Sequence, residues 1–68
     1  MKVTPIRARR IKMGLGVDEA LEKLKIGKSI FYKLEQGHRT PSVRLIVRMA
    51  RLYQCTTDEI FEDFNITD

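Results

Sequence analysis

The stretch from Val17 to Gln36, VDEALEKLKIGKSIFYKLEQ, is the most informative part of this 68-residue chain. Its first eight and last nine residues both repeat apolar side chains at the spacing of a helix. The apolar arc of the first segment is Val17, Ala20, Leu21 and Leu24, and that of the second is Ile30, Phe31 and Leu34. Only Lys25, Ile26 and Gly27 lie between them. The stretch therefore predicts two short amphipathic helices, 17–24 and 28–36, joined by a tight turn.

Three further helical patterns flank this pair. The first covers about residues 4–13, where Pro5 suits an opening turn and one face carries Val3, Ile6 and Met13, an apolar stripe that Arg10 interrupts. The next begins near Ser42, a favoured N-cap, and is the most hydrophobic, which makes it the expected spine of the core. The last begins at Thr56 or Thr57, and Thr56 with Glu59 fits a capping box. The whole pattern predicts an all-α chain, a compact five-helix bundle joined by tight turns.

Composition and charge narrow the class of protein. The hydrophobic content of 43% and charged content of 32% are typical of a globular domain. No apolar run is long enough to span a membrane, and the single cysteine, Cys55, fits a reducing compartment. All thirteen Lys and Arg lie in residues 1–54 with four of the nine acids, a net charge of +9, whereas residues 55–68 hold five acids and no base. A basic body with an acidic tail suggests a polyanion as one partner.

Two short amphipathic helices joined by a three-residue turn form a helix-turn-helix, in which the second helix enters the major groove of DNA. The segment 28–36 suits that role because one face is apolar and the other is polar. The polar face consists of Lys28, Ser29, Tyr32 and Lys33. Lysines there can donate to phosphates or to guanine acceptors. The expected partner is therefore double-stranded DNA.

Over roughly Ile6 to Phe61, the chain resembles the lambda-repressor/Cro-like helix-turn-helix domain, the XRE family. The resemblance rests on RRIKMGL, SIFYKLEQGHRTPS, VRMARLY and TTDEIF, and its most specific part is Glu-x-Gly-x-Arg-x-Pro-Ser from Glu35 to Ser42. Members are typically small DNA-binding regulators of phages, plasmids and bacterial chromosomes, often dimeric. The resemblance implies one lambda repressor-like domain over residues 1–68, with the helix-turn-helix at about 17–36 and an acidic tail at about 62–68. It also implies a cytoplasmic, nucleoid-associated transcriptional regulator, most commonly a repressor.

The resemblance also implies roles by position. Positions that usually face base edges hold Lys28, Ser29 and Lys33, and a position facing the groove or backbone holds Tyr32. Positions that usually meet phosphates hold Arg39, Thr40, Ser42 and Arg44. Arg10 and Glu35 match a pair that often forms a buried ion pair. The residues support this pair independently, because Arg10 interrupts an apolar stripe and a buried Arg needs a partner. The alternative is that both side chains reach water.

The chain departs from the family pattern around the first helix of the motif. Gly16 and Val17 stand where Ser or Thr and then Gln are common, and Lys25 replaces the familiar glycine after that helix. Gly27 appears two residues later, and the usual Leu-Ala order within the helix is reversed as Ala20-Leu21. These changes leave the tilt of helix 28–36 open.

Several residues have a plain interpretation beside a functional one. We interpret five basic residues as solvated surface rather than as a row of phosphate contacts: Arg7, Arg9, Lys12, Arg48 and Arg51. His38 has no companion for a metal site, and Cys55 is expected to be an inert buried thiol. Phe64 and Ile66 either close the core or form a dimer contact. No cofactor, metal or catalytic group is expected, so an enzyme is disfavoured. The alternative function is a protein-interaction module, such as an antitoxin or adaptor, with weak or no specific DNA binding.

Overall fold

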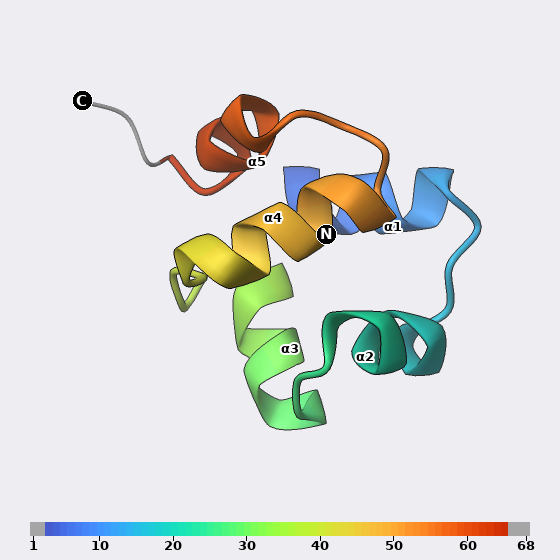
Figure 1. Cartoon of the computed structure of the whole chain (residues 1–68). Coiled ribbons are helices and arrows are strands. Elements are labelled where there is room, and N and C mark those ends of the chain that lie inside the picture. The colour runs from blue at the N-terminus through green and yellow to red at the C-terminus, as the bar shows by residue number, and fades with distance from the viewer. Residues whose placement is uncertain (1–2, 66–68) are drawn as a thin grey trace.

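The computed structural model describes residues 3–65, and these form five α-helices without a strand. The helices are α1 (Pro5–Lys12), α2 (Val17–Leu24), α3 (Lys28–Glu35), α4 (Val43–Leu52) and α5 (Thr57–Asp63). Helix α4 crosses the middle of the molecule, with α2 and α3 on one side of it and α1 and α5 on the other (Figure 1). The predicted all-α bundle is confirmed. None of the described helices is both long and apolar enough to cross a membrane.

Local capping explains where three of the helices begin. Thr4, which precedes Pro5 at the start of α1, accepts a hydrogen bond from the Arg7 amide through its side chain. At the start of α4, the Ser42 hydroxyl accepts one from the Leu45 amide at 3.2 Å. Thr56 and Glu59 form the predicted reciprocal capping box. Helices α2 and α3 differ, because each begins at a glycine and has no side-chain cap.

Helix ends are set by residues in the left-handed region of the backbone. Gly14 and Gly37 adopt φ values of +71° and +81°, conformations that glycine adopts without strain. Lys25 ends α2 at φ 58° and ψ 46°. A residue with a Cβ atom is disfavoured there by about 1–2 kcal/mol, so the turn of the helix-turn-helix stores a small strain.

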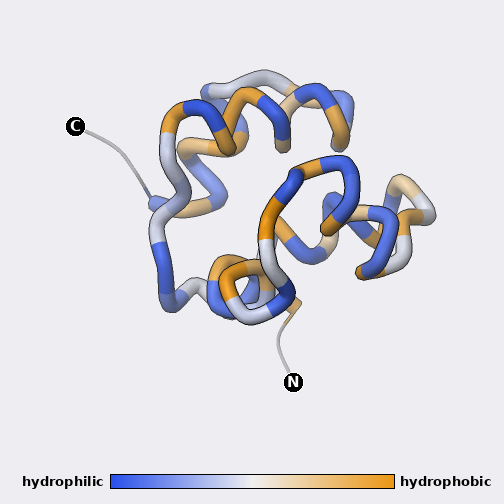
Figure 2. The backbone as a smooth tube through the Cα atoms, turned by 60° about the horizontal axis from the view of Figure 1, so that its bottom comes forward, coloured by the Kyte–Doolittle hydropathy of each residue, from blue (hydrophilic) through white to orange (hydrophobic). Residues whose placement is uncertain are grey.

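The core is assembled from one face of every helix. Its buried residues are Ile6, Ala20, Leu24, Phe31, Leu34, Leu45, Ile46, Met49, Ala50, Tyr53 and Ile60. Helix α4 contributes the most, as its hydrophobicity predicted, and hydrophobic and hydrophilic residues follow each other along the helical turns (Figure 2). Val3 is 52% exposed because it precedes the N-cap of α1, so the predicted apolar stripe begins at Ile6 instead.

An ion-pair cluster joins α1 to α5. The Arg9 guanidinium donates to both carboxylate oxygens of Asp63, and it lies 3.6 Å from the Glu59 carboxylate. The side chain of Asp63 is only 8% exposed. The interpretation of Arg9 as solvated surface was therefore wrong, since its acidic partners are 50 or more residues away in the sequence. Asp63, which lies in the predicted acidic tail, is the last residue of α5 and is paired with α1.

Candidate nucleic-acid interface

Helix α3 is held against the core by its inner face. Phe31, Leu34 and Glu35 are 0%, 1% and 6% exposed, respectively. Before it, the amide nitrogens of Lys25 and Ile26 both donate to the Leu21 carbonyl, at 2.8 Å and 3.4 Å. This turn sets the direction in which α3 leaves α2. Helix α3 ends at Glu35, one residue earlier than the sequence pattern predicted.

The outer face of α3 brings four of the predicted residues together. Lys28, Ser29, Tyr32 and Lys33 are all exposed. The Lys28 ammonium lies 6.0 Å from the centre of the Tyr32 ring, at the outer limit of a cation–π contact. Within residues 3–65, none of these four side chains forms an ion pair or a hydrogen bond. They are therefore available to an external partner.

Glu35, the last residue of α3, is buried and binds Arg10. Arg10 Nε donates to Glu35 Oε2 at 2.7 Å, Nη2 reaches Oε1 at 3.4 Å, and Nη1 donates to the Leu15 carbonyl at 2.9 Å. The hydrogen bond that Arg10 donates to Glu35 raises the pKa of Arg10, which keeps the guanidinium charged. The Thr4 hydroxyl donates to the backbone oxygen of Glu35. Because its one acid is buried and paired, the exposed surface of α3 carries the charges of Lys28 and Lys33 and no negative charge.

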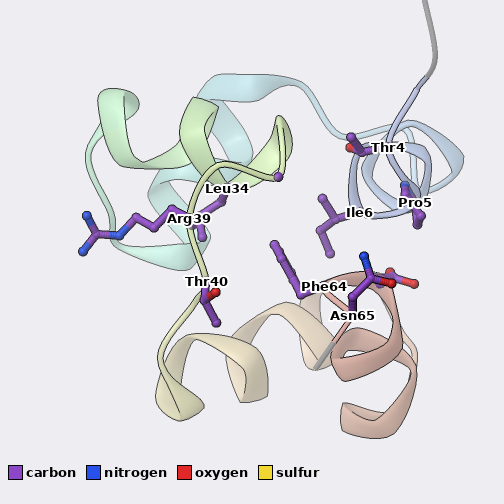
Figure 3. Close-up of a pocket in the computed structure, with 10 residues that line it drawn as sticks. Thr4, Pro5, Ile6, Leu34, Arg39, Thr40, Phe64 and Asn65 are labelled. Carbon is purple, nitrogen blue, oxygen red and sulfur yellow. The ribbon is translucent and has the colours of Figure 1, made fainter. Parts of the chain in front are cut away.

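The predicted phosphate-facing residues gather in the turn between α3 and α4. Arg39, Thr40, Ser42 and Arg44 are exposed. Pro41 is buried between them, and Gly37 reverses the chain, with its amide bonded to the Leu34 carbonyl at 3.1 Å. Arg39 extends away from the cavity that Ile6 and Phe64 line (Figure 3). The turn is thus anchored inside and presents its polar side chains outward.

A groove of about 350 Å³ connects the flank of α3 to this turn. It is lined by Ile26, Ile30, Leu34, Arg39, Thr40, Pro41, Ser42, Leu45 and Arg48. Ile30 is 36% exposed, although the sequence pattern placed it on the apolar arc. It is the edge of that arc, one turn before Leu34, and it faces the groove. The apolar surface beside the basic face was missed because periodicity gives the direction of a side chain and not the depth of the packing over it.

The remaining candidate residues lie away from α3. Phe64 is half-buried, packs against the core and lines a cavity of about 170 Å³ with Ile6 (Figure 3). Ile66, its companion in the predicted dimer contact, lies outside the described residues. Cys55 is half-buried rather than buried, and burial raises the pKa of its thiol. Among residues 3–65, no three His, Cys, Asp or Glu side chains are grouped to hold a metal ion.

The comparisons with known proteins agree with this geometry. The family model described as helix-turn-helix domain matches residues 5–61, from the start of α1 into α5. The chain belongs to the helix-turn-helix domain family. It is similar to an uncharacterized HTH-type transcriptional regulator of Archaeoglobus fulgidus, with 31% identity over 58 residues, 85% of this chain and 83% of that protein. No solved structure gives a significant match.

Proposed function

We propose that this protein is a sequence-specific, double-stranded DNA-binding regulator of transcription that acts as a repressor. The observation that carries the proposal is the outer face of α3, where Lys28, Ser29, Tyr32 and Lys33 are exposed and free of internal partners. Membership of the helix-turn-helix family and the printed name of the archaeal relative support it.

Base reading is assigned to the outer face of α3. Lys28 and Lys33 can donate to the O6 and N7 acceptors of guanine, and Ser29 can donate or accept. Tyr32 can pack on a sugar or a thymine methyl group. Burial of Glu35 supports this assignment, because an exposed carboxylate on the same helix would repel the phosphates on both sides of the major groove.

Backbone binding is assigned to the turn between α3 and α4. Arg39 and Arg44 supply positive charge, and Thr40 supplies a hydroxyl group. The Ser42 oxygen already accepts a hydrogen bond from Leu45, but its own hydrogen is free to donate to a phosphate. Contacts of this kind position a protein on the duplex without reading its sequence.

A homodimer completes the proposal. Its two-fold symmetry would place the two α3 helices about 34 Å apart, one turn of DNA, so that both can enter the major groove on one side of the duplex. The proposed contact involves Phe64, which is half-buried beside the core, and Ile66. Such a dimer bound to a near-palindromic site in the nucleoid would compete with other proteins for that stretch of DNA.

The division into reading and positioning residues is tested with two single variants. Lys33→Ala should lower affinity for the preferred site by roughly 1–3 kcal/mol and relax preference at one base pair. Arg39→Ala should weaken binding to all sequences alike and lower the salt slope by about one. Lys12→Ala, which removes an exposed charge from α1, is the matched control. Equal effects of Lys33→Ala and Arg39→Ala on sequence preference would contradict the division.

Val17 and Lys25 differ from the residues that are common at these positions in the family, and this leaves a second function to be tested. A protein-interaction module of the same fold would use its surface for a protein partner instead of DNA. Binding to mixed genomic DNA at low salt separates the two functions, because phosphate contacts are strongest there. If no complex forms under those conditions, the regulator proposal fails and the interaction module is favoured.

A further inference from the structure

The carbonyl oxygen of Leu24 has an unusual partner. Leu24 is the last residue of α2 and is 0% exposed. Carbonyl groups in the last turn of a helix lack a partner within the helix, and a buried carbonyl without a hydrogen bond is costly. Among the described residues, the donor that reaches this oxygen is Arg48 of α4, whose Nη1 lies 3.3 Å away. The solvated interpretation of Arg48 was therefore incomplete, because its side chain is exposed while one of its donors is used internally.

This hydrogen bond lies at the start of the turn that directs α3. Lys25, the next residue, is held in the left-handed conformation, and only two residues separate it from the start of α3. Arg48 comes from the same helix whose first turn carries Arg44 and whose N-cap is Ser42. Its side chain also lines the groove beside Ile26 and Ile30. Arg48 thus ties the turn before α3 to the helix that follows the phosphate-facing turn.

We propose that Arg48 is a positioning residue for DNA reading: by satisfying the Leu24 carbonyl it fixes the angle between α2 and α3 relative to α4. This inference rests on the proposed function. It assigns to Arg48 an effect on sequence discrimination and no direct contact with a base or phosphate. The hydrogen bond from Arg48 acts at the turn where this chain has Lys25 in place of glycine. The backbone of that turn is strained, because Lys25 adopts the left-handed conformation.

The sharpest variant is Arg48→Met, which keeps an apolar stem over the Leu24 carbonyl and removes the donor. Arg51→Met is the matched control, since Arg51 lies on the same exposed face of α4 and loses the same charge. Arg51 makes no side-chain hydrogen bond within residues 3–65. Arg48→Lys tests rescue, because its ammonium group restores a donor.

The first measurement needs no DNA. Amide hydrogen exchange of the free protein should be about five-fold faster at Lys25 and Ile26 in Arg48→Met than in the parent, the factor that corresponds to about 1 kcal/mol. Arg51→Met should leave these two amides unchanged, and Arg48→Lys should restore part of the protection. Unchanged exchange in Arg48→Met would show that Arg48 does not stabilise this turn, and it would overturn the proposal whatever the protein binds.

The second measurement separates positioning from simple structural support or charge. The ratio of affinities for the preferred duplex and a scrambled duplex should fall about five-fold in Arg48→Met and stay at the parental value in Arg51→Met, with equal salt slopes for both variants. An unchanged ratio, or a salt slope lowered in Arg48→Met alone, would overturn the positioning role. Failure of the parent protein to bind DNA would instead refute the proposed function and, with it, the positioning role, while the exchange result would still stand.

Discussion

Replacing Glu35 tests how α3 is held in place. Arg10 and Glu35 are 8% and 6% exposed, and two charge-assisted hydrogen bonds join them. In Glu35→Gln the guanidinium stays buried without a compensating charge. Breaking such a pair from one side typically costs about 3–5 kcal/mol. A chain of 68 residues has a total stability of about 3–10 kcal/mol, so this single atom exchange should remove a large part of it.

The assay is urea unfolding followed by circular dichroism at the helical band, which suits an all-α chain with no tryptophan. The matched control is Glu22→Gln, an exposed acid on α2 whose replacement should change stability by less than about 0.5 kcal/mol. If Glu35→Gln is too unstable to fold, the double variant Arg10→Met with Glu35→Leu still decides the matter. Removing both charges should restore stability to within about 1 kcal/mol of the parent, because no charge is then buried alone.

Parental stability in Glu35→Gln would contradict this role of the ion pair, because it would mean that Arg10 is neutralised or hydrated in some other way. The same conclusion would follow if the double variant were less stable than either single variant. In both cases the ion pair would not be what orients α3.

Three further predictions concern the turn and the titrating groups. Lys25→Gly should raise the free energy of unfolding by about 1 kcal/mol, or Tm by about 4–8 °C, because glycine relieves the left-handed strain. The control Lys23→Gly, inside α2, should lower the free energy of unfolding by a similar amount. A change in the same direction in both variants would contradict this account of Lys25. Burial raises the pKa of Tyr53 to about 12 from 10.0, so the parent should lose about 3 kcal/mol of stability as the pH rises from 10 to beyond 12. Tyr53→Phe should lack that component in alkaline denaturation curves. Hydrogen bonds from Thr56 lower the pKa of Glu59 below its ordinary 4.5, so its contribution is present above that pH and is lost on further acidification; Glu59→Gln should show a shallower acid transition, and an unchanged transition would contradict the capping box.

The sequence predicted the features that depend on neighbours along the chain. Apolar spacing gave α2 its observed bounds and α3 its bounds to within one residue, and the caps at Ser42 and Thr56 were predicted correctly. These signals are local, since a cap or an amphipathic face is specified within a few residues. The grouping of Lys28, Ser29, Tyr32 and Lys33 on one face followed from the same periodicity.

The features that were missed depend on packing between distant segments. Arg9 looked like a solvated residue because its partner Asp63 is 54 positions away. Arg48 looked like one more member of a basic strip, because no pattern in the sequence shows that its guanidinium meets the end of α2. The exposure of Ile30 was missed for the same reason, since the depth of packing over its side chain depends on how α3 and α4 meet.

The proposed role of α3 is to read the sequence of double-stranded DNA. Selection of bound duplexes from a random pool by the full chain tests it most directly. We predict enrichment of a near-palindrome whose half-sites lie about 10–10.5 base pairs apart, and loss of that enrichment when Lys28 and Lys33 are both replaced by alanine. A bound pool with no enriched sequence, or one that keeps its preference in the double variant, would contradict the claim.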